Sequence, residues 1–383
     1  MTSWTSSLAR LVGCSAMLLA LSCAAGTTRV RAIAQAPAAG PRVRLAVMPP
    51  ENLTGGKVPL ASLHAAVREE LTKSGFSFVD DSAMEPFLAR HRIRYTGGVS
   101  GTTSAAVATD LAAEALLVTT VESYEAEGVP SIAIGMRLVS ATDPPVVLWT
   151  GMNGASGGDN PGLFERGIIG DAATLQRTLL GTLAQSLADF LARGGAQATT
   201  CTGGWRFRPQ TSFLAAPHAE SRVRVVAVLP FVNETARLKA GESIALEMLR
   251  ELHATPGYAV VEPGVVREEM LRRRIIFEDG VSLDVARQLL DKLGADVVVG
   301  GRVFDHSDAG ARAAVVSFSS FMLERGANPL VWATSSYHEG DDGVFFFDLG
   351  RVGTAAGLAC EMVSEAVDEL ALGAPTERIE WIQ

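Results

Sequence analysis

Apolar residues recur at two different periods along the first half of the chain. A short continuous run such as 43–48, which two prolines end, is typical of a buried strand. Over 60–73 the apolar positions return every three or four residues, which predicts a helix, and Gly75 suits its end. These periods predict strands at 43–48, 76–79, 116–124, 131–140 and 146–151, and helices at 60–73, after Asp80-Asp81-Ser82, at 103–113 and at 164–190.

The order of these predicted elements is β-α-β-α-α-β-β-β-α. The first two strands are joined through a helix, so we expect them to lie parallel with a right-handed crossover. The last three strands follow one another closely and should form an antiparallel meander. The pattern therefore predicts an α/β fold with an α+β-like mixed sheet, on which the helices pack.

The second half of the chain repeats the first. V-R-L-A-V-M-P-P-E-N at 43–52 corresponds to R-V-V-A-V-L-P-F-V-N at 224–233, an offset of 181 (227 − 46). The offset is 182 (280 − 98) between the two Gly-Val-Ser stretches, and 183 (332 − 149) between Trp149 and Trp332. So small a drift indicates one duplicated unit, which is too long for a solenoid repeat and has the size of a domain.

Two tandem domains follow from this duplication. We predict them at 43–193 and 223–372, joined by a linker at 194–222 that is rich in Gly, Thr and Pro. The linker also contains Trp205, Phe207 and Phe213, which are candidates for packing on a domain face. Residues 373–383 are predicted to be a C-terminal tail.

The N-terminal segment is predicted to direct export. Arg10 precedes an apolar run at 11–21, which has the length of a signal-peptide core and is too short to span a bilayer. The next residues complete the sequence Ala20-Leu21-Ser22-Cys23, which resembles a bacterial lipobox with a lipidated Cys. We predict a signal peptide at 1–22, lipidation of Cys23 and a flexible tether at 23–42. Ordinary cleavage after Ala34 is the alternative.

Composition narrows the class of partner. The net charge of −9 argues against a general phosphate-binding surface and therefore against nucleic acid. Each repeat is long enough to bury a core without disulfides. Cys201 and Cys360 have no counterparts in the other repeat; they could pair in an oxidising compartment, but an apolar helix position favours a buried free thiol at Cys360.

Chemistry-bearing residues form no recognisable constellation. The histidines are scattered without metal-ligand spacing, and only His306 has an acid close by in the sequence (His64, His91, His218, His253, His306, His338). The basic stretches 90–94 and 272–274 occupy equivalent places and are typical of solvated helix faces, with an acidic partner as the alternative.

Three short motifs do not match the functional sites that they resemble. The loop at 53–57 lacks the first glycine of a phosphate loop, and 98–101 lacks the second glycine of a nucleophile elbow. The acidic stretch 339–342 fits a turn better than a cation site. We therefore predict no catalytic, cofactor-binding or metal-binding residues and no cofactor.

The second repeat resembles a known family. Its A-V-L-P-F-V-N at 227–233, the stretch 294–303 and the strand end at 330–333 resemble bacterial envelope lipoproteins related to CsgG, the curli secretion channel, and to LpoB, the penicillin-binding-protein activator. The resemblance implies an α/β domain on a lipoprotein that acts through protein contacts without catalytic residues. Unlike the CsgG channel, this chain has only short segments at 122–131 and 304–312, which leave no room for extra membrane strands.

Three functions stay open at this point. The leading hypothesis is a non-enzymatic lipoprotein, anchored on the periplasmic side of the outer membrane, that docks envelope proteins in an outer-membrane or cell-wall complex. The first alternative is a homo-oligomeric subunit of a CsgG-like secretion channel. The second is a ligand-binding protein or hydrolytic enzyme with a site between the repeats, which would need polar groups that converge in a cleft.

Overall fold

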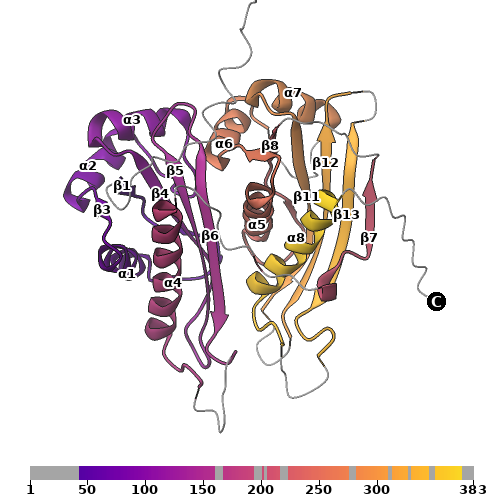
Figure 1. The fold of residues 1–383 in the computed structure, drawn as a ribbon, viewed down its shortest axis with the longest axis horizontal. Helices are drawn as coiled ribbons and strands as arrows, with labels where there is room; N and C mark the ends of the chain where they lie inside the picture. Colours follow the sequence, from indigo (N-terminus) through magenta and orange to yellow (C-terminus); the bar gives the residue numbers. More distant parts are fainter. Residues whose placement is uncertain are drawn as a thin grey trace, which may run out of the picture. The chain divides into compact units, whose positions relative to one another are not determined.

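Two mixed β-sheets, one from each repeat, carry helices on their faces (Figure 1). The computed structural model describes residues 43–159, 167–193, 201, 205–215, 223–275, 282–308, 313–326, 329–344 and 350–372. The predicted signal peptide, the lipidation site Cys23, the tether and the C-terminal tail lie outside the described residues.

The first sheet has the strand order β3-β1-β4-β5-β6, with the short strand β2 beside β4. Strand β1 runs parallel to β3 and β4, and β4, β5 and β6 form an antiparallel meander, as predicted. The elements are β1 Arg44–Val47, β2 Glu51–Asn52, α1 Leu60–Lys73, β3 Ser77–Phe78, α2 Asp81–Arg90, α3 Gly101–Leu111, β4 Ala115–Glu125, β5 Ser131–Ser140, β6 Val147–Ser156 and α4 Ala172–Ala192.

The second sheet repeats this topology in the order β10-β8-β11-β12-β13-β7, with β9 beside β11. The predicted fold class is therefore confirmed. The elements are η3 Trp205–Phe207, β7 Thr211–Leu214, β8 Arg224–Val228, β9 Val232–Asn233, α5 Ala240–Ala254, β10 Tyr258–Val260, α6 Pro263–Arg272, α7 Leu283–Leu293, β11 Val297–Ser307, β12 Val315–Glu324, β13 Leu330–Glu339 and α8 Ala355–Leu372.

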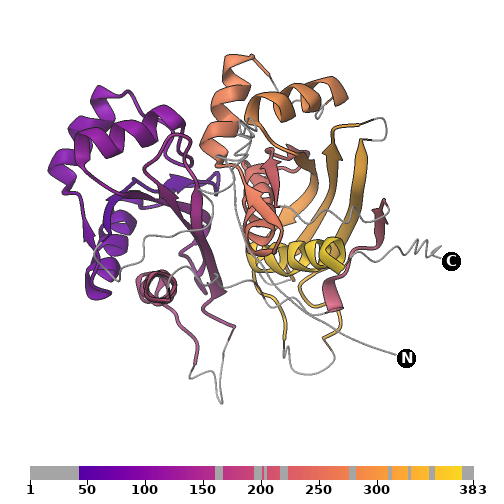
Figure 2. The ribbon, with the colours of Figure 1, turned by 45° about the horizontal axis from the view of Figure 1, so that its top comes forward.

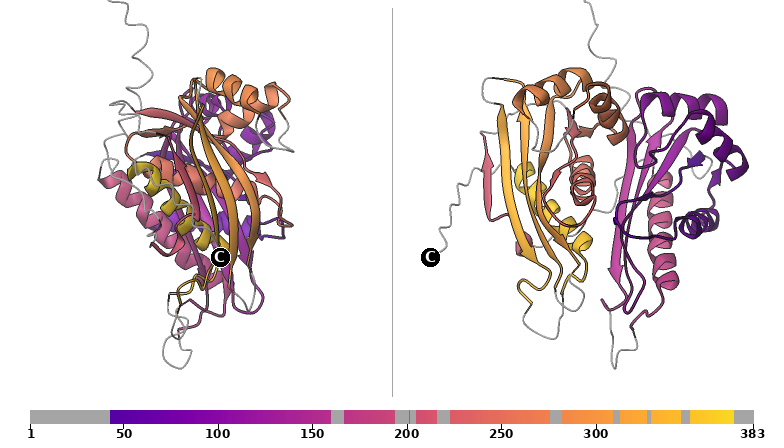
Figure 3. Two further views of the ribbon diagram at one scale, coloured as in Figure 1. Left: turned by 90° about the vertical axis from the view of Figure 1, so that its right-hand side faces the viewer. Right: turned by 180° about the vertical axis from the view of Figure 1, so that it is seen from behind.

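Strand β7 comes from the segment that was expected to be a linker. It pairs antiparallel with β13, with Leu214 opposite Trp332, and it forms the outer edge of the second sheet (Figure 3). Leu214 packs against the core of that sheet, and Phe207 is fully buried. Burial of these apolar side chains explains why part of the segment joins the sheet. The exact domain boundaries stay a prediction.

The asparagine that both repeats share closes a turn after the first strand. The side-chain oxygen of Asn52 accepts a hydrogen bond from the backbone N–H of Thr54 at 2.9 Å, and its amide donates to the carbonyl of Gly56. Asn233 makes the same bonds to Thr235 and Arg237. This is an Asx turn, for which Asn and Asp are suited. The region 53–57 is therefore a turn and not a phosphate loop.

The shared serine is a helix cap. Ser100 accepts a hydrogen bond from the N–H of Thr103 at the start of α3, and Ser282 accepts one from Val285 at the start of α7. A side-chain oxygen at this position satisfies one of the free N–H groups of the first helical turn. The residues that are conserved between the repeats thus specify turns and caps.

Each sheet has helices on both faces (Figure 2). In the first half α1 and α4 cover one face, and α2 and α3 cover part of the other. In the second half α5 and α8 cover one face, and α6 and α7 cover part of the other. Trp149 and Trp332 are buried in the two cores, as predicted from their matching positions.

A disulfide joins Cys201 to Cys360, with their Cα atoms 5.8 Å apart. The expectation of a free thiol at Cys360 was therefore wrong. Cys201 is 159 residues away in the sequence but lies beside α8, where its carbonyl accepts a hydrogen bond from Ser364 at 3.2 Å. Only the tertiary fold brings the two sulfur atoms together, because sequence spacing carries no information on so long a loop.

We predict that Trp332→Ala lowers the free energy of unfolding by roughly 3–5 kcal/mol, because it empties a large buried volume. Trp332 is only 1% exposed. Tyr337 on the same strand is the matched control: it is 49% exposed, so Tyr337→Ala should cost less than about 1 kcal/mol. Chemical denaturation measures both. Equal losses in the two variants would contradict the proposed core.

Candidate protein-docking surface

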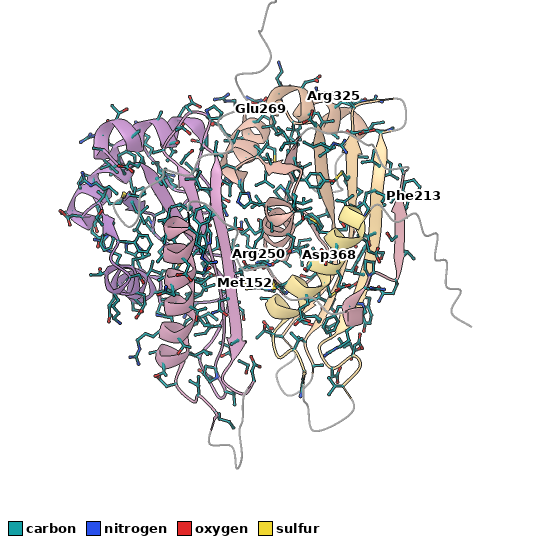
Figure 4. All side chains as sticks on the ribbon, viewed as in Figure 1. Met152, Phe213, Arg250, Glu269, Arg325 and Asp368 are labelled. Carbon is teal, nitrogen blue, oxygen red and sulfur yellow. A yellow bond between two sulfur atoms is a disulfide. The ribbon has the colours of Figure 1, made fainter. Side chains whose placement is uncertain are left out.

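Polar side chains occupy one face of the first sheet and are nevertheless buried. They lie on β4, β5 and β6, outside the area that α2 and α3 cover, and they include Thr120, Glu122, Arg137 and Thr150. Together with Leu246, Leu249 and Arg250 of α5 they line a cavity of about 20 Å³. Helix α5 of the second half therefore packs on this face of the first sheet. Figure 4 marks Arg250 on α5 and Met152 on β6, between the two sheets.

A buried ion pair crosses the junction between the halves. The guanidinium of Arg137 donates to Glu262 from Nε at 2.9 Å and from Nη2 at 3.1 Å. Nη2 also donates to the carbonyl of Gly97, and Glu262 accepts from the N–H of Val99 at 2.9 Å. Glu262 is completely buried. Its carboxylate thus binds one charged and one backbone donor from the other half, which makes such a buried pair tolerable.

Glycines allow the backbones to approach at this point. A Cβ at Gly98 would lie 2.7 Å from the backbone nitrogen of Gly264, and a Cβ at Gly264 would overlap the backbone of Val99. Val146 and Val261 form an antiparallel bridge nearby. The close packing at the start of α6 therefore requires residues without side chains.

The acid in this buried region is not a plausible catalytic group. Burial raises the pKa of Glu122 to about 6, against the opposing effects of Arg250 and Arg237. A carboxyl with such a pKa can serve in general acid–base catalysis. However, Glu122 is 2% exposed, and the adjoining 20 Å³ is enough for about one water molecule. A substrate cannot reach it.

The second sheet has an equivalent face. In the first sheet Val118, Arg137 and Thr150 lie in one cross-strand row. The matching row of the second sheet contains Gly300, Phe321, Ala333 and Phe213. At the offset of 182 (304 − 122), Phe304 occupies the place of Glu122. Aromatic and small residues thus replace the buried polar ones.

This face is uncovered in the described part of the chain. Phe304, Tyr337 and Phe213 are 45%, 49% and 45% exposed, and Figure 4 marks Phe213 on the outermost strand. In the left view of Figure 3, β12 and β13 face the reader and no described helix lies over their lower part. We call Phe213, Phe304, Phe321 and Tyr337 the aromatic face. Exposed apolar side chains on one sheet face make this face a candidate interaction site.

Acidic partners lie near more histidines than the sequence indicated. His64 is 3.4 Å from Asp81, His91 is 2.9 Å from Asp110, and His338 is 2.7 Å from Asp342. The sequence analysis missed Asp342, which lies on the turn four residues after His338. Asp81 and Asp110 come from other elements, 17 and 19 residues away from His64 and His91, so closeness in the sequence could not identify them. His306 faces Arg237 instead, and burial together with that cation lowers the pKa of His306 to about 3.

These pairs are local and do not make a metal site. The described residues contain no group of three or more His, Cys, Asp and Glu side chains that could hold a metal ion. The acidic stretch at 339–342 is a turn in which the carboxylate of Asp342 accepts from the N–H of Glu339. Asp159 makes the corresponding bond to Ser156 in the first half. Among the described helices, none has the length and apolar character to cross a membrane.

The basic stretches make local ion pairs. Arg90 and His91 contact Asp110 on α3, and Arg272 and Arg273 contact acids one turn earlier on α6. Arg90 and Arg272 are exposed, which agrees with the prediction of solvated helix faces, whereas Arg273 is half-buried.

Sequence reasoning missed Arg137, Glu262 and the aromatic face. One signal was present: Arg137 interrupts the apolar run of a buried strand, between Met136 and Leu138. A charge in such a position requires a buried partner. Nothing in the sequence identified Glu262 as that partner or showed which sheet face stays uncovered.

Comparison with known proteins finds partial similarity to solved structures. No family model matches the chain, and no curated protein matches it. Among solved structures the chain is similar to a PelC dodecamer from Paraburkholderia phytofirmans, with 17% identity, a TM-score of 0.29, and coverage of 42% of this chain and 96% of that chain. A lipoprotein from Neisseria meningitidis matches with 19% identity and a TM-score of 0.29, over 39% of this chain and 99% of that chain.

The LpoB C-terminal domain from Escherichia coli is also matched, with 17% identity and a TM-score of 0.25, over 33% of this chain and 92% of that chain. Each match covers almost all of the solved chain but less than half of this chain. LpoB is thus among the matched structures, whereas the resemblance to CsgG stays a prediction.

We predict that Glu262→Ala lowers the free energy of unfolding by about 3–5 kcal/mol, because it leaves the charge of Arg137 buried without a partner. Replacing both residues by Met should cost less than the single change, since no charge is then buried. Arg272→Ala, which removes a solvent-exposed pair on the same helix, should cost less than about 1 kcal/mol. Urea unfolding of the three variants tests this. A double variant that is less stable than Glu262→Ala would contradict the role of the pair.

Proposed function

We propose that this protein is a non-enzymatic, lipid-anchored protein of the cell envelope that docks a partner protein on the aromatic face of its second sheet. One observation carries the proposal: the same sheet face is covered by a helix in the first half, whereas in the second half no described element covers it. A sheet face with exposed aromatic side chains keeps apolar surface in contact with water. This contact is unfavourable until a partner packs on the face.

The composition of the aromatic face suits an interface. Tyrosine and phenylalanine are enriched at protein contacts, whereas lysine and glutamate are depleted. The rows around the aromatic side chains contain small polar residues, such as Ser319 and Ser335, that leave room for a partner's side chains. In the first half the equivalent face is covered by Leu246 and Leu249 of helix α5. A partner helix with an apolar stripe could pack on the aromatic face in the same way.

A second copy of this chain fits less well in that geometry. Helix α1 is the counterpart of α5 at the offset of 181, so Ala65 and Arg68 stand where α5 has Leu246 and Leu249 (246 − 65 and 249 − 68). Ala65 is exposed, and Arg68 forms an ion pair with Asp81. The outward side of α1 therefore lacks the apolar stripe. This favours a different protein as the partner over a ring of identical subunits.

The envelope location is part of the same proposal. The apolar run at 11–21 and the lipobox-like sequence before Cys23 support export and lipidation. Ala24, and not Asp, follows the Cys, which under the sorting habit of the family that the chain resembles favours the outer membrane. The anchor would hold the aromatic face within reach of other envelope proteins.

The docking proposal is tested with Phe304→Ser and Tyr337→Ser in one variant. We expect photo-crosslinks from a probe at Phe213 to a single envelope protein to be lost, because the variant removes apolar contact area at the centre of the face. Val129→Ser is the matched control, since Val129 is 49% exposed in the first half, and its crosslinks should persist.

Thermal unfolding shows that each variant is folded, and light scattering reports the oligomeric state. Crosslinks that survive the double change would refute the aromatic face as the docking site. Crosslinks between copies of this chain would support the channel-type homo-oligomer instead.

The anchor is tested by Cys23→Ala. Without the thiol the chain cannot accept a lipid, so we expect the variant to leave the membrane fraction or to accumulate unprocessed. Fractionation with immunoblotting checks both. Ser22→Ala, which keeps the thiol, is the control and should still be anchored. A Cys23→Ala variant that is processed and fractionates unchanged would show that ordinary cleavage is correct.

A further inference from the structure

A second feature of the junction is an apolar cavity with walls from both halves. Its volume is about 240 Å³, which exceeds an engineered cavity of about 150 Å³ that binds benzene. The first half contributes Leu53, Tyr95, Gly97 and Thr120, and most of the other lining residues come from α5 and α6. Leu249, Val266 and Met270 form its inner wall, and Leu271 lies at its rim with 61% exposure. The cavity therefore accepts an apolar body of appreciable size.

Two polar groups meet at this cavity. The guanidinium of Arg267 lies 4.5 Å from the centre of the Tyr95 ring, in a cation–π contact, and both residues line the cavity. Burial raises the pKa of Tyr95 to about 12, so its hydroxyl stays protonated and can donate a hydrogen bond. Within the described part of the chain, Arg267 has no carboxylate partner and the hydroxyl of Tyr95 has no hydrogen-bond partner.

The other charges of the cavity are already paired. Lys239 and Glu242, which line the cavity, lie 3.0 Å apart and neutralise each other. Glu51 does not line the cavity; its carboxylate accepts a hydrogen bond from Thr96. Gly97 and Gly98 leave the space that the ring of Tyr95 needs, because a Cβ at either position would lie within 3.2 Å of the ring or its hydroxyl. One cation and one hydroxyl donor thus remain for a ligand.

We propose that this cavity binds a small amphiphile with an apolar body and one carboxylate. The apolar body occupies the space between Leu249, Val266 and Met270, and the carboxylate accepts from Arg267 and Tyr95. A sugar would leave its hydroxyls unpaired against these walls, and a nucleotide would bring more negative charge than one unpaired cation can balance. Because the walls come from both halves, an occupant also tightens the junction.

Decanoate is the probe for this proposal, with decanol as its uncharged counterpart, and calorimetric titration of the full chain measures binding. We expect decanoate to bind and to raise the unfolding temperature, since a ligand that binds only the folded state stabilises it. Decanol should bind about tenfold more weakly, because it cannot make the charge-assisted hydrogen bonds.

Three variants test whether Arg267 and the entrance of the cavity determine binding, and not its apolar volume alone. Arg267→Gln should weaken decanoate binding about tenfold and leave decanol binding unchanged. Leu271→Trp, at the exposed rim, should obstruct entry and weaken both ligands without emptying the core. Arg272→Gln removes a neighbouring cation of α6 that does not line the cavity, and should change neither affinity.

Three outcomes would overturn the proposal: no binding of decanoate, equal affinities for decanoate and decanol, or equal effects of Arg267→Gln and Arg272→Gln. None of these outcomes depends on the aromatic face or on a partner protein. The docking proposal and the cavity proposal can therefore fail separately.

Discussion

The arrangement of the two halves depends on the buried contact between Arg137 and Glu262. Each charge would be unacceptable in its own half, because removing an unpaired ion from water costs several kcal/mol. Glu262 stands at the start of α6 and Arg137 in the middle of β5, so their pairing fixes α6 against the first sheet. The glycines at 98 and 264 let the backbones meet closely enough for these bonds.

This contact gives the two copies of one fold different surroundings. The polar face of the first sheet is removed from water by α5, and the equivalent face of the second sheet has no such cover among the described residues. The substitution pattern follows this difference: Arg137 and Glu122 stand where the second half has Phe321 and Phe304. The first half therefore uses this sheet face for packing within the chain, whereas the described part of the second half leaves the equivalent face exposed. The same junction encloses the apolar cavity beside Tyr95 and Arg267.

The sequence by itself determined the repeated fold. Periods of two and of three to four residues give strands and helices, and short connections give parallel and antiparallel neighbours. The shared residues act locally: Asn52 and Asn233 close turns, and Ser100 and Ser282 cap helices. Such bonds join residues two to three positions apart, so a linear pattern is enough to predict their place.

Only the tertiary structure decided how the copies meet. Arg137 and Glu262 are 125 residues apart, and Cys201 and Cys360 are 159 apart; neither pair leaves a periodic trace in the sequence. Residues 211–214 form a strand because they pair with the edge strand β13 and because Leu214 packs against the core. Which sheet face is buried depends on packing between elements that are distant in the chain, because side-chain alternation specifies two faces but not what covers each.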